Sequence, residues 1–288
     1  MSMTKKLLFL FDTDPVASVF DTVVGYDGGA DHIIGYGGVT KANVGALVDG
    51  CIYTRGPKEK QFTAIFVGGG DMTAGEAVFN AVKKRFFSNF RVSAMLDSNG
   101  SNTTAAAGVA LLAKARPLAG KKAVVLAGTG PVGMRAAAML NIEGAEVAIT
   151  SREKSRADAA SKAIQDRFGF TPTPIEAADN AARAQAIKGA QIVFAAGAIG
   201  VPLLDEKDWQ NDPTVELLAD CNAQPPLGIG GVEAIDKAKD RHGKIVIGAL
   251  GLGGLKLKLH RECVGKLFES ADKIFDCENI YAQAKELA

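Results

Sequence analysis

The sequence is poor in the residues from which metal sites are built. Its 288 residues include four cysteines and three histidines, and no two cysteines form a C-x-x-C pair. A zinc site is therefore not expected. We interpret the thiols as those of a reduced, cytoplasmic protein. They are Cys51, Cys221, Cys263 and Cys277.

The chain also lacks a charge imbalance and a long apolar run. Its formal net charge is +1 at pH 7, which gives no electrostatic reason to expect nucleic acid or an anionic membrane as a partner. The apolar run near the N-terminus stops at Asp12, too early for a signal-peptide core or a membrane span. We expect this run, residues 6–11, to form the first strand.

The most informative stretch that is present is KKAVVLAGTGPVG, residues 121–133. An apolar strand is followed by a glycine turn and then by a helix. This is G-x-G-x-x-G in the context that binds dinucleotides: Gly128 makes the tight turn, Gly130 lets a pyrophosphate approach the backbone, and Gly133 lets helix and strand pack closely. The predicted cofactor contacts here are Gly128, Thr129, Gly130, Pro131, Val132 and Gly133.

The end of the next strand, residues 145–150, bears on which dinucleotide is bound. NAD enzymes usually place a carboxylate there. Here Ser151 and Arg152 follow the strand, with Arg156 close behind, and hydroxyl and guanidinium groups suit a 2′-phosphate. We therefore predict NADP as the cofactor, bound by these three residues. Glu153 leaves NAD open if the strand ends later, and a solvated turn of mixed charge is a third interpretation.

Strands alternate with helices along the whole chain, which is typical of parallel sheets. A run of small and polar residues, 98–104, separates two such series. We predict an α/β protein with two domains. Residues 1–104 form an α/β domain with parallel strands that binds the substrate, and 105–269 form a Rossmann-type, doubly wound parallel sheet that binds NADP. A final helix within 270–288 is expected to pack on the first domain.

Loops after the later strands are further cofactor candidates, because doubly wound sheets bind ligands outside the carboxyl ends of their strands. These candidates are Ala196, Gly197, Ala198, Ile199, Asn222, Leu252 and Gly253. Tight turns that need glycine would explain the glycines equally well. Lys256 and His260 lie four residues apart, hence on one helical face. We place Lys256 in the site and leave His260 on a solvated helix face.

Polar side chains also follow the strands of the first half. The first strand is followed by Asp12, Thr13, Asp14 and Ser18, and two later strands by Asp71 and Asp97. Carboxylates at this edge could hold the N–H groups of a heterocycle or stabilise a positive charge that develops on it. Helix capping by Asp14 is the alternative. The expected helix begins at Asp14-Pro15 and buries Val16, Val19, Phe20 and Val23.

Several longer motifs point to one family. They are FDTDPVASVFDTVVGYDGGADH, YTRGPKEK, FVGGGDM, LDSNGSNTTAAAG, LAGTGPVGMR, NAQPPLGIGG and GALGLGGLKLKLHR. With these motifs the chain resembles, over nearly its full length, the bacterial NADP-dependent methylenetetrahydromethanopterin dehydrogenases of methylotrophs, which also accept methylenetetrahydrofolate. The resemblance implies hydride transfer from the methylene bridge to NADP+, giving a methenyl cation. It also implies a homo-oligomer, with a trimer among the candidates.

Such a hydride transfer needs no acid–base pair, because no proton need move at the reacting carbon. The protein's work is then positioning and electrostatics. We predict Asp14, Asn102 and Lys256 as catalytic residues, with Lys256 orienting a pterin carbonyl. The predicted substrate contacts are Asp12, Thr13, Asp14, Ser18, Asp97, Asn99, Asn102, Thr103 and Lys256. We find no dedicated residues for hydrolysis of the methenyl product.

Two other functions stay open at this point. Asn102-Thr103 resembles the corresponding pair of shikimate dehydrogenases, so one alternative is an NADP oxidoreductase that acts on a small hydroxy acid. That activity requires a lysine–aspartate pair, for which Lys60 or Lys256 with Asp97 could be argued. The other alternative is a non-catalytic NADP-binding sensor, against which the polar strand ends of the first domain speak.

Overall fold

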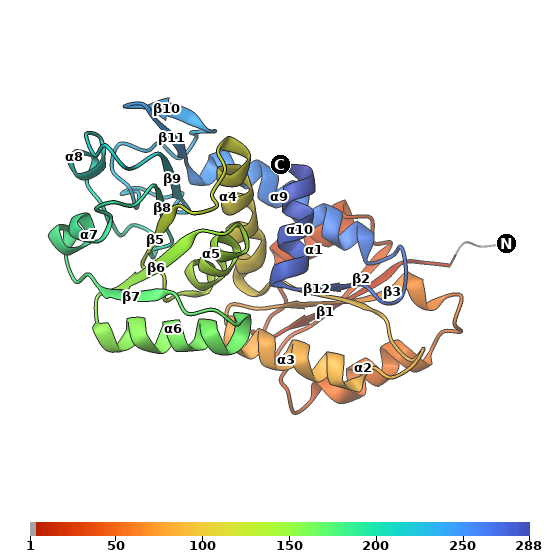
Figure 1. Cartoon of the computed structure of the whole chain (residues 1–288). Coiled ribbons are helices and arrows are strands. Elements are labelled where there is room, and N and C mark those ends of the chain that lie inside the picture. Colours follow the sequence, from red (N-terminus) through yellow and green to blue (C-terminus); the bar gives the residue numbers. More distant parts are fainter. Residues whose placement is uncertain (1–3) are drawn as a thin grey trace. The chain divides into compact units, whose positions relative to one another are not determined.

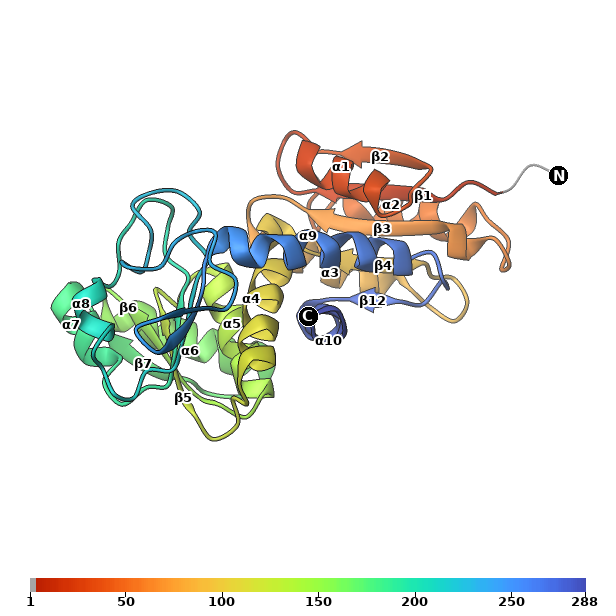
Figure 2. The same cartoon turned by 90° about the horizontal axis from the view of Figure 1, so that it is seen from above.

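The computed structural model describes residues 4–288, which divide into two compact units. The first unit holds the chain up to Thr103, together with Leu257–Gln283 and Leu287; the second holds Thr104–Lys256, Ala284–Glu286 and Ala288. Each unit has its own sheet of mainly parallel strands with helices packed on it (Figure 1, Figure 2). The expected α/β class is therefore confirmed. The roles assigned to residues 1–104 and 105–269 stay a prediction.

The first unit is built on a five-stranded parallel sheet with the order β12-β4-β3-β1-β2. Its strands are β1 Leu7–Asp12, β2 His32–Tyr36, β3 Thr63–Gly68, β4 Ser93–Leu96 and β12 Ile274–Phe275, and its first three helices are α1 Val19–Asp27, α2 Val44–Tyr53 and α3 Met72–Arg85. Short 3-10 turns span Lys60–Phe62 and Ser98–Gly100. Because the strands are parallel, the side chains that follow their carboxyl ends collect at one edge.

The inner strands β1, β3 and β4 of this sheet are apolar on both faces because helices cover both, whereas the edge strand β2 is largely exposed. Phe11 and Ile65 belong to the core under α2 and α3, with Val48 and Val78 from the helices. Leu8 points to the opposite face, where α1 packs. Figure 1 shows α2 and α3 on one side of the strands and α1 on the other. Continuous burial of this kind is what parallel sheets require.

The predicted start of the first helix, at Asp14-Pro15, is wrong. The buried carboxylate of Asp12 accepts from the backbone N–H of Asp14 at 2.8 Å and of Ser18 at 2.9 Å, which holds the intervening segment as a loop. The helix α1 begins at Val19, and Ser18 caps it by accepting from Asp21 N. The apolar residues assigned to its inner face are largely exposed: Val16 78%, Val19 77%, Phe20 48% and Val23 53%.

The second unit has a seven-stranded sheet with the order β10-β11-β9-β8-β5-β6-β7, in which β10 alone is antiparallel. Its strands are β5 Lys122–Leu126, β6 Glu146–Ser151, β7 Thr173–Glu176, β8 Ile192–Ala195, β9 Leu217–Asp220, β10 Lys239–Arg241 and β11 Lys244–Ile247. Its helices are α5 Pro131–Ile142, α6 Lys154–Phe168, α7 Asn180–Ala186 and α8 Glu206–Trp209. Helices α4 Ser101–Ala115, α9 Ala249–Lys266 and α10 Cys277–Leu287 have residues in both units.

The six parallel strands of this sheet follow the doubly wound order 3-2-1-4-5-6, with the reversal between β5 and β8. A ligand is expected outside the carboxyl ends of the strands at that reversal. One local expectation was wrong: the glycines after β11 do not form a loop but lie in the first turns of α9. Gly251 fits there because a Cβ on it would lie 1.8 Å from the backbone oxygen of Asp236.

Asp212 provides a test of the second unit by pH. Its carboxylate is buried and accepts from Thr214 N at 2.8 Å and from Thr214 Oγ1 at 2.6 Å, with Lys188 Nζ at 3.2 Å. Burial by itself raises the pKa of this carboxyl, but the hydrogen bonds from Thr214 and the charge of Lys188 outweigh burial and lower it to about 2. A lowered folded-state pKa adds stability above the unfolded value of 3.8.

We expect Asp212→Asn to lower the free energy of unfolding by about 1–2 kcal/mol at pH 7. The difference from the native protein should shrink as the pH falls from about 4 to about 2, because the native carboxylate then takes up a proton. Urea unfolding at several pH values measures this. Asp166→Asn, which alters an exposed pair with Lys162, is the control and should change stability by less than about 0.5 kcal/mol. A pH-independent cost of Asp212→Asn would contradict the prediction.

Candidate functional site

The turn after β5 brings the start of α5 against the strand. A Cβ on Gly133 would lie 2.7 Å from the Cα of Gly128, and one on Gly128 would lie 2.9 Å from the Cβ of Ile149, so both positions need glycine for packing. A Cβ on Gly130 would meet nothing within 4 Å. Gly130 precedes Pro131, the first residue of α5. The open space therefore lies at a helix N-terminus, which favours an anion.

Gly133→Ala should destabilise the second unit by about 1–3 kcal/mol, because the added methyl group meets rigid backbone. Gly254→Ala is the matched control, since Gly254 is also helical and a Cβ there meets nothing within 4 Å. That substitution should leave stability unchanged or raise it by up to about 1 kcal/mol. Urea unfolding of the two variants measures the difference, and equal stabilities would refute the packing role of Gly133.

A pocket of about 180 Å³ opens next to this turn, at the carboxyl ends of β5, β6, β7 and β8. It is lined by Ala127, Thr129, Thr150, Ser151, Arg152, Arg156, Ala177, Arg183, Gly197, Ala198, Val201 and Leu203. Residues predicted from separate parts of the sequence thus lie together: the fingerprint threonine, the end of β6 and the turn after β8. The pocket stands beside the strand reversal, where the topology places a ligand.

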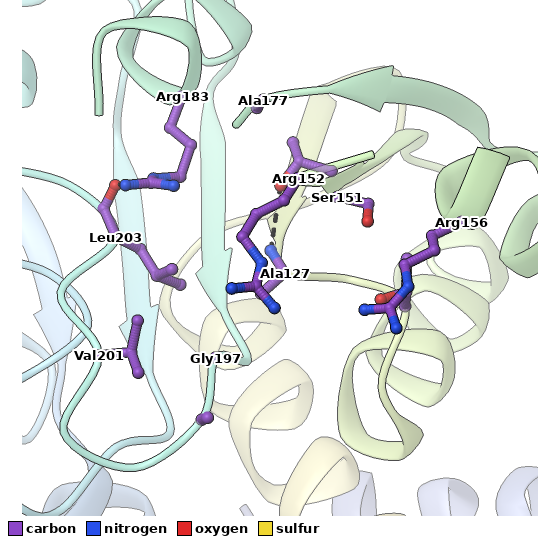
Figure 3. A pocket seen from close by; sticks show the side chains of 12 residues that line it. Ala127, Ser151, Arg152, Arg156, Ala177, Arg183, Gly197, Val201 and Leu203 are labelled. Carbon is purple, nitrogen blue, oxygen red and sulfur yellow. Dashed lines mark hydrogen bonds between the residues drawn. The ribbon is translucent and has the colours of Figure 1, made fainter. Parts of the chain in front are cut away.

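The pocket is positively charged. Arg152, Arg156 and Arg183 line it, and its lining includes no carboxylate from the part of the chain that the structure describes. In Figure 3 the guanidinium of Arg152 lies between those of Arg183 and Arg156, and the Ser151 side chain lies nearby. Guanidinium groups converging on a space with a hydroxyl suit a phosphate, which accepts several charge-assisted hydrogen bonds.

Glu153, which left NAD open in the sequence, lies outside the pocket lining. The strand β6 ends at Ser151, one residue later than predicted, which is the condition that left NAD open; Glu153 nevertheless occupies the N-cap position of α6. Its side chain is 62% exposed, and its carboxylate lies 3.6 Å from Arg156 Nε. The charge inside the pocket is therefore set by arginine, which favours a 2′-phosphate over a 2′-hydroxyl.

Arg183 is a pocket residue that the sequence analysis missed. It lies on α7, a short helix that was not predicted, and its Nε–H donates to the carbonyl of Leu203. Burial lowers the pKa of Arg183, as does the charge of Arg152, while Asp179 acts in the opposite direction. The cap Asp179 before α7 was a usable sequence signal for the helix. Nothing local in the sequence directs the side chain to this pocket.

Other predicted cofactor contacts lie outside this pocket lining: Gly128, Gly130, Pro131, Val132, Gly133, Ala196, Ile199, Asn222, Leu252 and Gly253. Asn222 is buried, and its side chain organises its own loop, donating to Pro226 O at 3.2 Å and accepting from Gln224 N at 3.1 Å. Leu252 is 3% exposed inside α9. Contact of these residues with a cofactor stays a prediction.

In the first unit, the loops after β1 and β3 are joined by polar contacts at the carboxyl edge of the sheet. Asp14 Oδ2 accepts from Gly70 N at 2.9 Å, and Thr13 Oγ1 donates to Gly68 O at 3.4 Å. Asp14 is exposed, whereas Asp12 is buried and used by the backbone. Of the first two carboxylates, Asp14 is therefore the one that a ligand can reach.

Asp97 organises the neighbouring part of this edge. The carboxylate is 1% exposed and accepts from Asn102 N at 2.8 Å, Thr103 N at 3.1 Å and Thr103 Oγ1 at 2.6 Å, which caps α4. Asn102 Nδ2 donates to Leu96 O at 2.6 Å. Asn99 has φ 55°, and its N–H donates to Gly69 O at 2.7 Å. Asn102 and Thr103 are thus buried parts of this network, and their contact with a substrate stays a prediction.

His260 lies beside Asp97, with Nδ1 3.9 Å from Asp97 Oδ2. The imidazole is 1% exposed, stacks on Phe66 at 5.3 Å between ring centroids and lies 6.2 Å from Phe20. The expectation of a solvated helix face for His260 was therefore wrong. On the same helix Lys256 is partly buried. The sequence offered no signal for His260 beyond its place on α9, because its neighbours come from three distant segments.

Within residues 4–288, no three His, Cys, Asp or Glu side chains gather in a way that could hold a metal ion. Over the same described range, no helix combines the length and the hydropathy needed to cross a membrane. The four cysteines are free thiols, and burial raises the pKa of the Cys51 thiol to about 12.

Comparisons with known proteins identify a family to which this chain is similar. A family model described as "Methylene-tetrahydromethanopterin dehydrogenase, N-terminal" matches residues 19–99. The chain is 66% identical to "Bifunctional protein MdtA" of Methylorubrum extorquens, over 99% of this chain and 100% of that protein. It is 29% identical to the "NAD(P)-dependent methylenetetrahydromethanopterin dehydrogenase" of the same organism, again over 99% and 100% of the two chains.

A solved structure with a similar fold is a shikimate 5-dehydrogenase from Mycobacterium fortuitum, with a TM-score of 0.54 and 14% identity over 98% of this chain and 99% of that chain. At this identity the likeness concerns the fold alone. It agrees with the doubly wound order of the second unit.

Proposed function

The chain belongs to the methylenetetrahydromethanopterin dehydrogenase family, and from this premise we propose that it oxidises the methylene bridge of methylenetetrahydromethanopterin, and of methylenetetrahydrofolate, with NADP+. A hydride leaves the bridge carbon with its electron pair, and the product is a methenyl cation delocalised over the two neighbouring nitrogens. NADPH is the second product.

The arginine pocket at the end of β6 is the observation that carries the choice of cofactor. It combines Ser151, Arg152 and Arg183, and none of the described residues that line it is a carboxylate, which suits a 2′-phosphate. The glycine turn beside it leaves open space at the N-terminus of α5, which suits the pyrophosphate. The residues therefore fit both phosphate-bearing parts of NADP, the 2′-phosphate and the pyrophosphate.

When bound, NADP+ supplies the hydride acceptor, and the chain's own residues position the two reactants. We propose that the exposed carboxylate of Asp14 favours the developing cation and that Lys256 orients a pterin carbonyl. Asn102 contributes by holding the start of α4 and, with it, the buried carboxylate of Asp97. No residue needs to take a proton from the reacting carbon, so the chain's contribution is electrostatic and orientational.

A shikimate-dehydrogenase-like activity requires a lysine–aspartate pair, and the structure separates one of the two candidate pairs, Lys60 with Asp97. Lys60 precedes the amino end of β3, whereas Asp97 follows the carboxyl end of β4, so the two lie at opposite edges of a parallel sheet. Lys60 is buried instead, with Nζ donating to Asn89 O at 2.7 Å. A non-catalytic NADP sensor would bind NADPH but show no turnover, and following NADPH absorbance distinguishes such a sensor from an enzyme.

We also propose that the protein is a cytoplasmic homo-oligomer, with a trimer as the first assembly to test. The exposed apolar side chains of Val16, Val19 and Val23 support association, because a second copy would remove them from water. Free, buried thiols suit a reducing compartment. Light scattering coupled to size-exclusion chromatography measures the subunit number.

The proposed activity is tested by following NADPH absorbance with NADP+ and methylenetetrahydromethanopterin, and separately with methylenetetrahydrofolate. We expect turnover with both carriers. The absence of turnover with both would refute the proposal. Shikimate with NADP+ is the control substrate and should give no signal.

A further inference from the structure

Arg183 has a hydrogen-bonding role besides its charge. Its Nε–H is engaged by the carbonyl of Leu203, while its guanidinium lines the pocket with that of Arg152. Figure 3 shows the Arg183 guanidinium beside Leu203 at the wall of the pocket. The side chain is thereby fixed from one side by the backbone and presents its other N–H groups toward the space that we assign to the 2′-phosphate.

Leu203 is in turn hydrogen-bonded to a second loop of the same unit, the loop that follows β9. The backbone N–H groups of Leu203 and Leu204 donate to Gly228 O at 2.8 and 3.1 Å, and Gly230 N donates back to Leu204 O at 2.8 Å. A bridge pairs Leu204 with Ile229. The segment that Arg183 holds is therefore paired, as a short strand would be, with the end of the loop that follows β9.

Asp220 fixes both ends of this loop. It is 1% exposed at the carboxyl end of β9, where Oδ1 accepts from Asn222 N at 2.9 Å and Oδ2 accepts from Ile229 N at 2.8 Å. A Cβ on Gly228 would lie 2.9 Å from Asp220 Oδ1, so the loop backbone is pressed against the carboxylate. A shift of Gly228 would therefore disturb the Asp220 carboxylate and, with it, the hydrogen bond from Asn222 N.

The arginines of the pocket and this loop belong to opposite sides of the strand reversal. Arg152 follows β6 and Arg183 follows β7, whereas the loop follows β9, so β5 and β8 lie between these strands in the sheet. A dinucleotide bound in an extended form across a doubly wound sheet puts its adenosine at one side of the reversal and its nicotinamide at the other. Arg183 is thus connected by hydrogen bonds, through Leu203 and Gly228, to the loop at the reactive end.

We propose that Arg183 is both a specificity-determining and a positioning residue: its guanidinium binds the 2′-phosphate, and its Nε–H, through the Leu203 carbonyl, holds the 221–229 loop beside the nicotinamide. This inference rests on the proposed function. A phosphate that orients the guanidinium also keeps the Nε–H on Leu203. NADP+ therefore improves the placement of its own nicotinamide, and the preference over NAD+ appears in kcat as well as in KM.

Two substitutions of nearly equal length separate the roles. In Arg183→Gln the amide nitrogen takes the place of Nε along the side chain, so the charge is lost while a donor to Leu203 O is kept. In Arg183→Met both are lost. The control is Lys154→Ala, which removes a neighbouring cation that lies outside the pocket lining and pairs with Asp158. Each variant is assayed with NADP+ and with NAD+ at saturating pterin.

With NADP+, both Arg183 variants should show a KM raised by about ten- to a hundredfold, the effect of losing a charged hydrogen bond, whereas Lys154→Ala should change the KM by less than about twofold. With NAD+, which has no 2′-phosphate, Lys154→Ala should keep the native kcat, and Arg183→Gln should stay close to it because the donor to Leu203 O is kept. Arg183→Met should lower that kcat by about three- to tenfold, the effect of losing one neutral hydrogen bond. Thermal unfolding checks that each variant is folded.

Equal kcat values for Arg183→Gln and Arg183→Met with NAD+ would overturn the positioning role. An unchanged KM for NADP+ in both variants would overturn the phosphate role. If Arg183→Met does not fold, Arg183→Ala takes its place in the comparison with Arg183→Gln. Failure of the proposed function itself looks different, since the native protein would then show no turnover with either cofactor.

Discussion

Arg152→Ala is expected to raise the KM for NADP+ by about ten- to a hundredfold and to leave the KM for NAD+ nearly unchanged. Arg152 lies between two other arginines in a pocket that no carboxylate among residues 4–288 lines. A charged hydrogen bond to a phosphate is worth about 1–3 kcal/mol, and one tenfold step corresponds to about 1.4 kcal/mol. NAD+ has a neutral 2′-hydroxyl at that position, so the substitution should weaken its binding little. Initial rates with the two cofactors measure the change.

The control for this prediction is Lys154→Ala. Lys154 is a neighbouring cation whose charge is engaged outside the pocket, by Asp158 one helical turn away. Its loss should change the KM for NADP+ by less than about twofold, as expected for an exposed ion pair. Equal losses of Arg152→Ala with NADP+ and NAD+ would refute the assignment of the pocket to the 2′-phosphate. Because Arg152 and Arg183 face the same space, their combined loss should be non-additive.

Asp97→Ala is expected to lower the free energy of unfolding by about 3–5 kcal/mol and to abolish activity. The substitution removes the carboxylate that accepts from the N–H groups of Asn102 and Thr103, and it leaves the Thr103 hydroxyl only its longer contact with Gly100 O at 3.3 Å. An unsatisfied buried donor costs about 1–3 kcal/mol, and His260 loses the carboxylate beside it. Urea unfolding and the NADPH assay measure the two effects.

Asp71→Ala is the matched control, because Asp71 also caps a helix by accepting from two backbone N–H groups but is exposed. Loss of that cap should cost about 1 kcal/mol. Asp97→Asn keeps one acceptor oxygen, so its cost in free energy of unfolding should fall between those of Asp97→Ala and Asp71→Ala. If Asp97→Ala costs no more than Asp71→Ala, burial of this carboxylate does not matter to the fold and the prediction is wrong.

Some parts of the site were predictable because their signal is local. The apolar run and glycines around Gly128 encode a strand, a turn and a helix within one short stretch, and the structure has them there. The end of β6 was predicted to within one residue for the same reason, and it places Arg152 at the pocket. In each case the residues that decide the local structure are neighbours in the chain.

Other parts were not predictable because their partners are distant in the sequence. The start of α1 depends on the buried carboxylate of Asp12, whose burial requires the whole sheet of the first unit. His260 is surrounded by Phe20, Phe66 and Asp97, which come from three separate segments. No periodicity within α9 reports such a neighbourhood.

The sequence by itself determined that this chain is an α/β protein with a glycine turn for a dinucleotide, and its motifs pointed to the family. Only the tertiary structure excluded Glu153 from the pocket lining, brought Arg183 into it and buried His260 beside Asp97. The physical reason is that strand and turn preferences act over a few residues, whereas burial and charge clustering depend on which distant segments the sheet brings together.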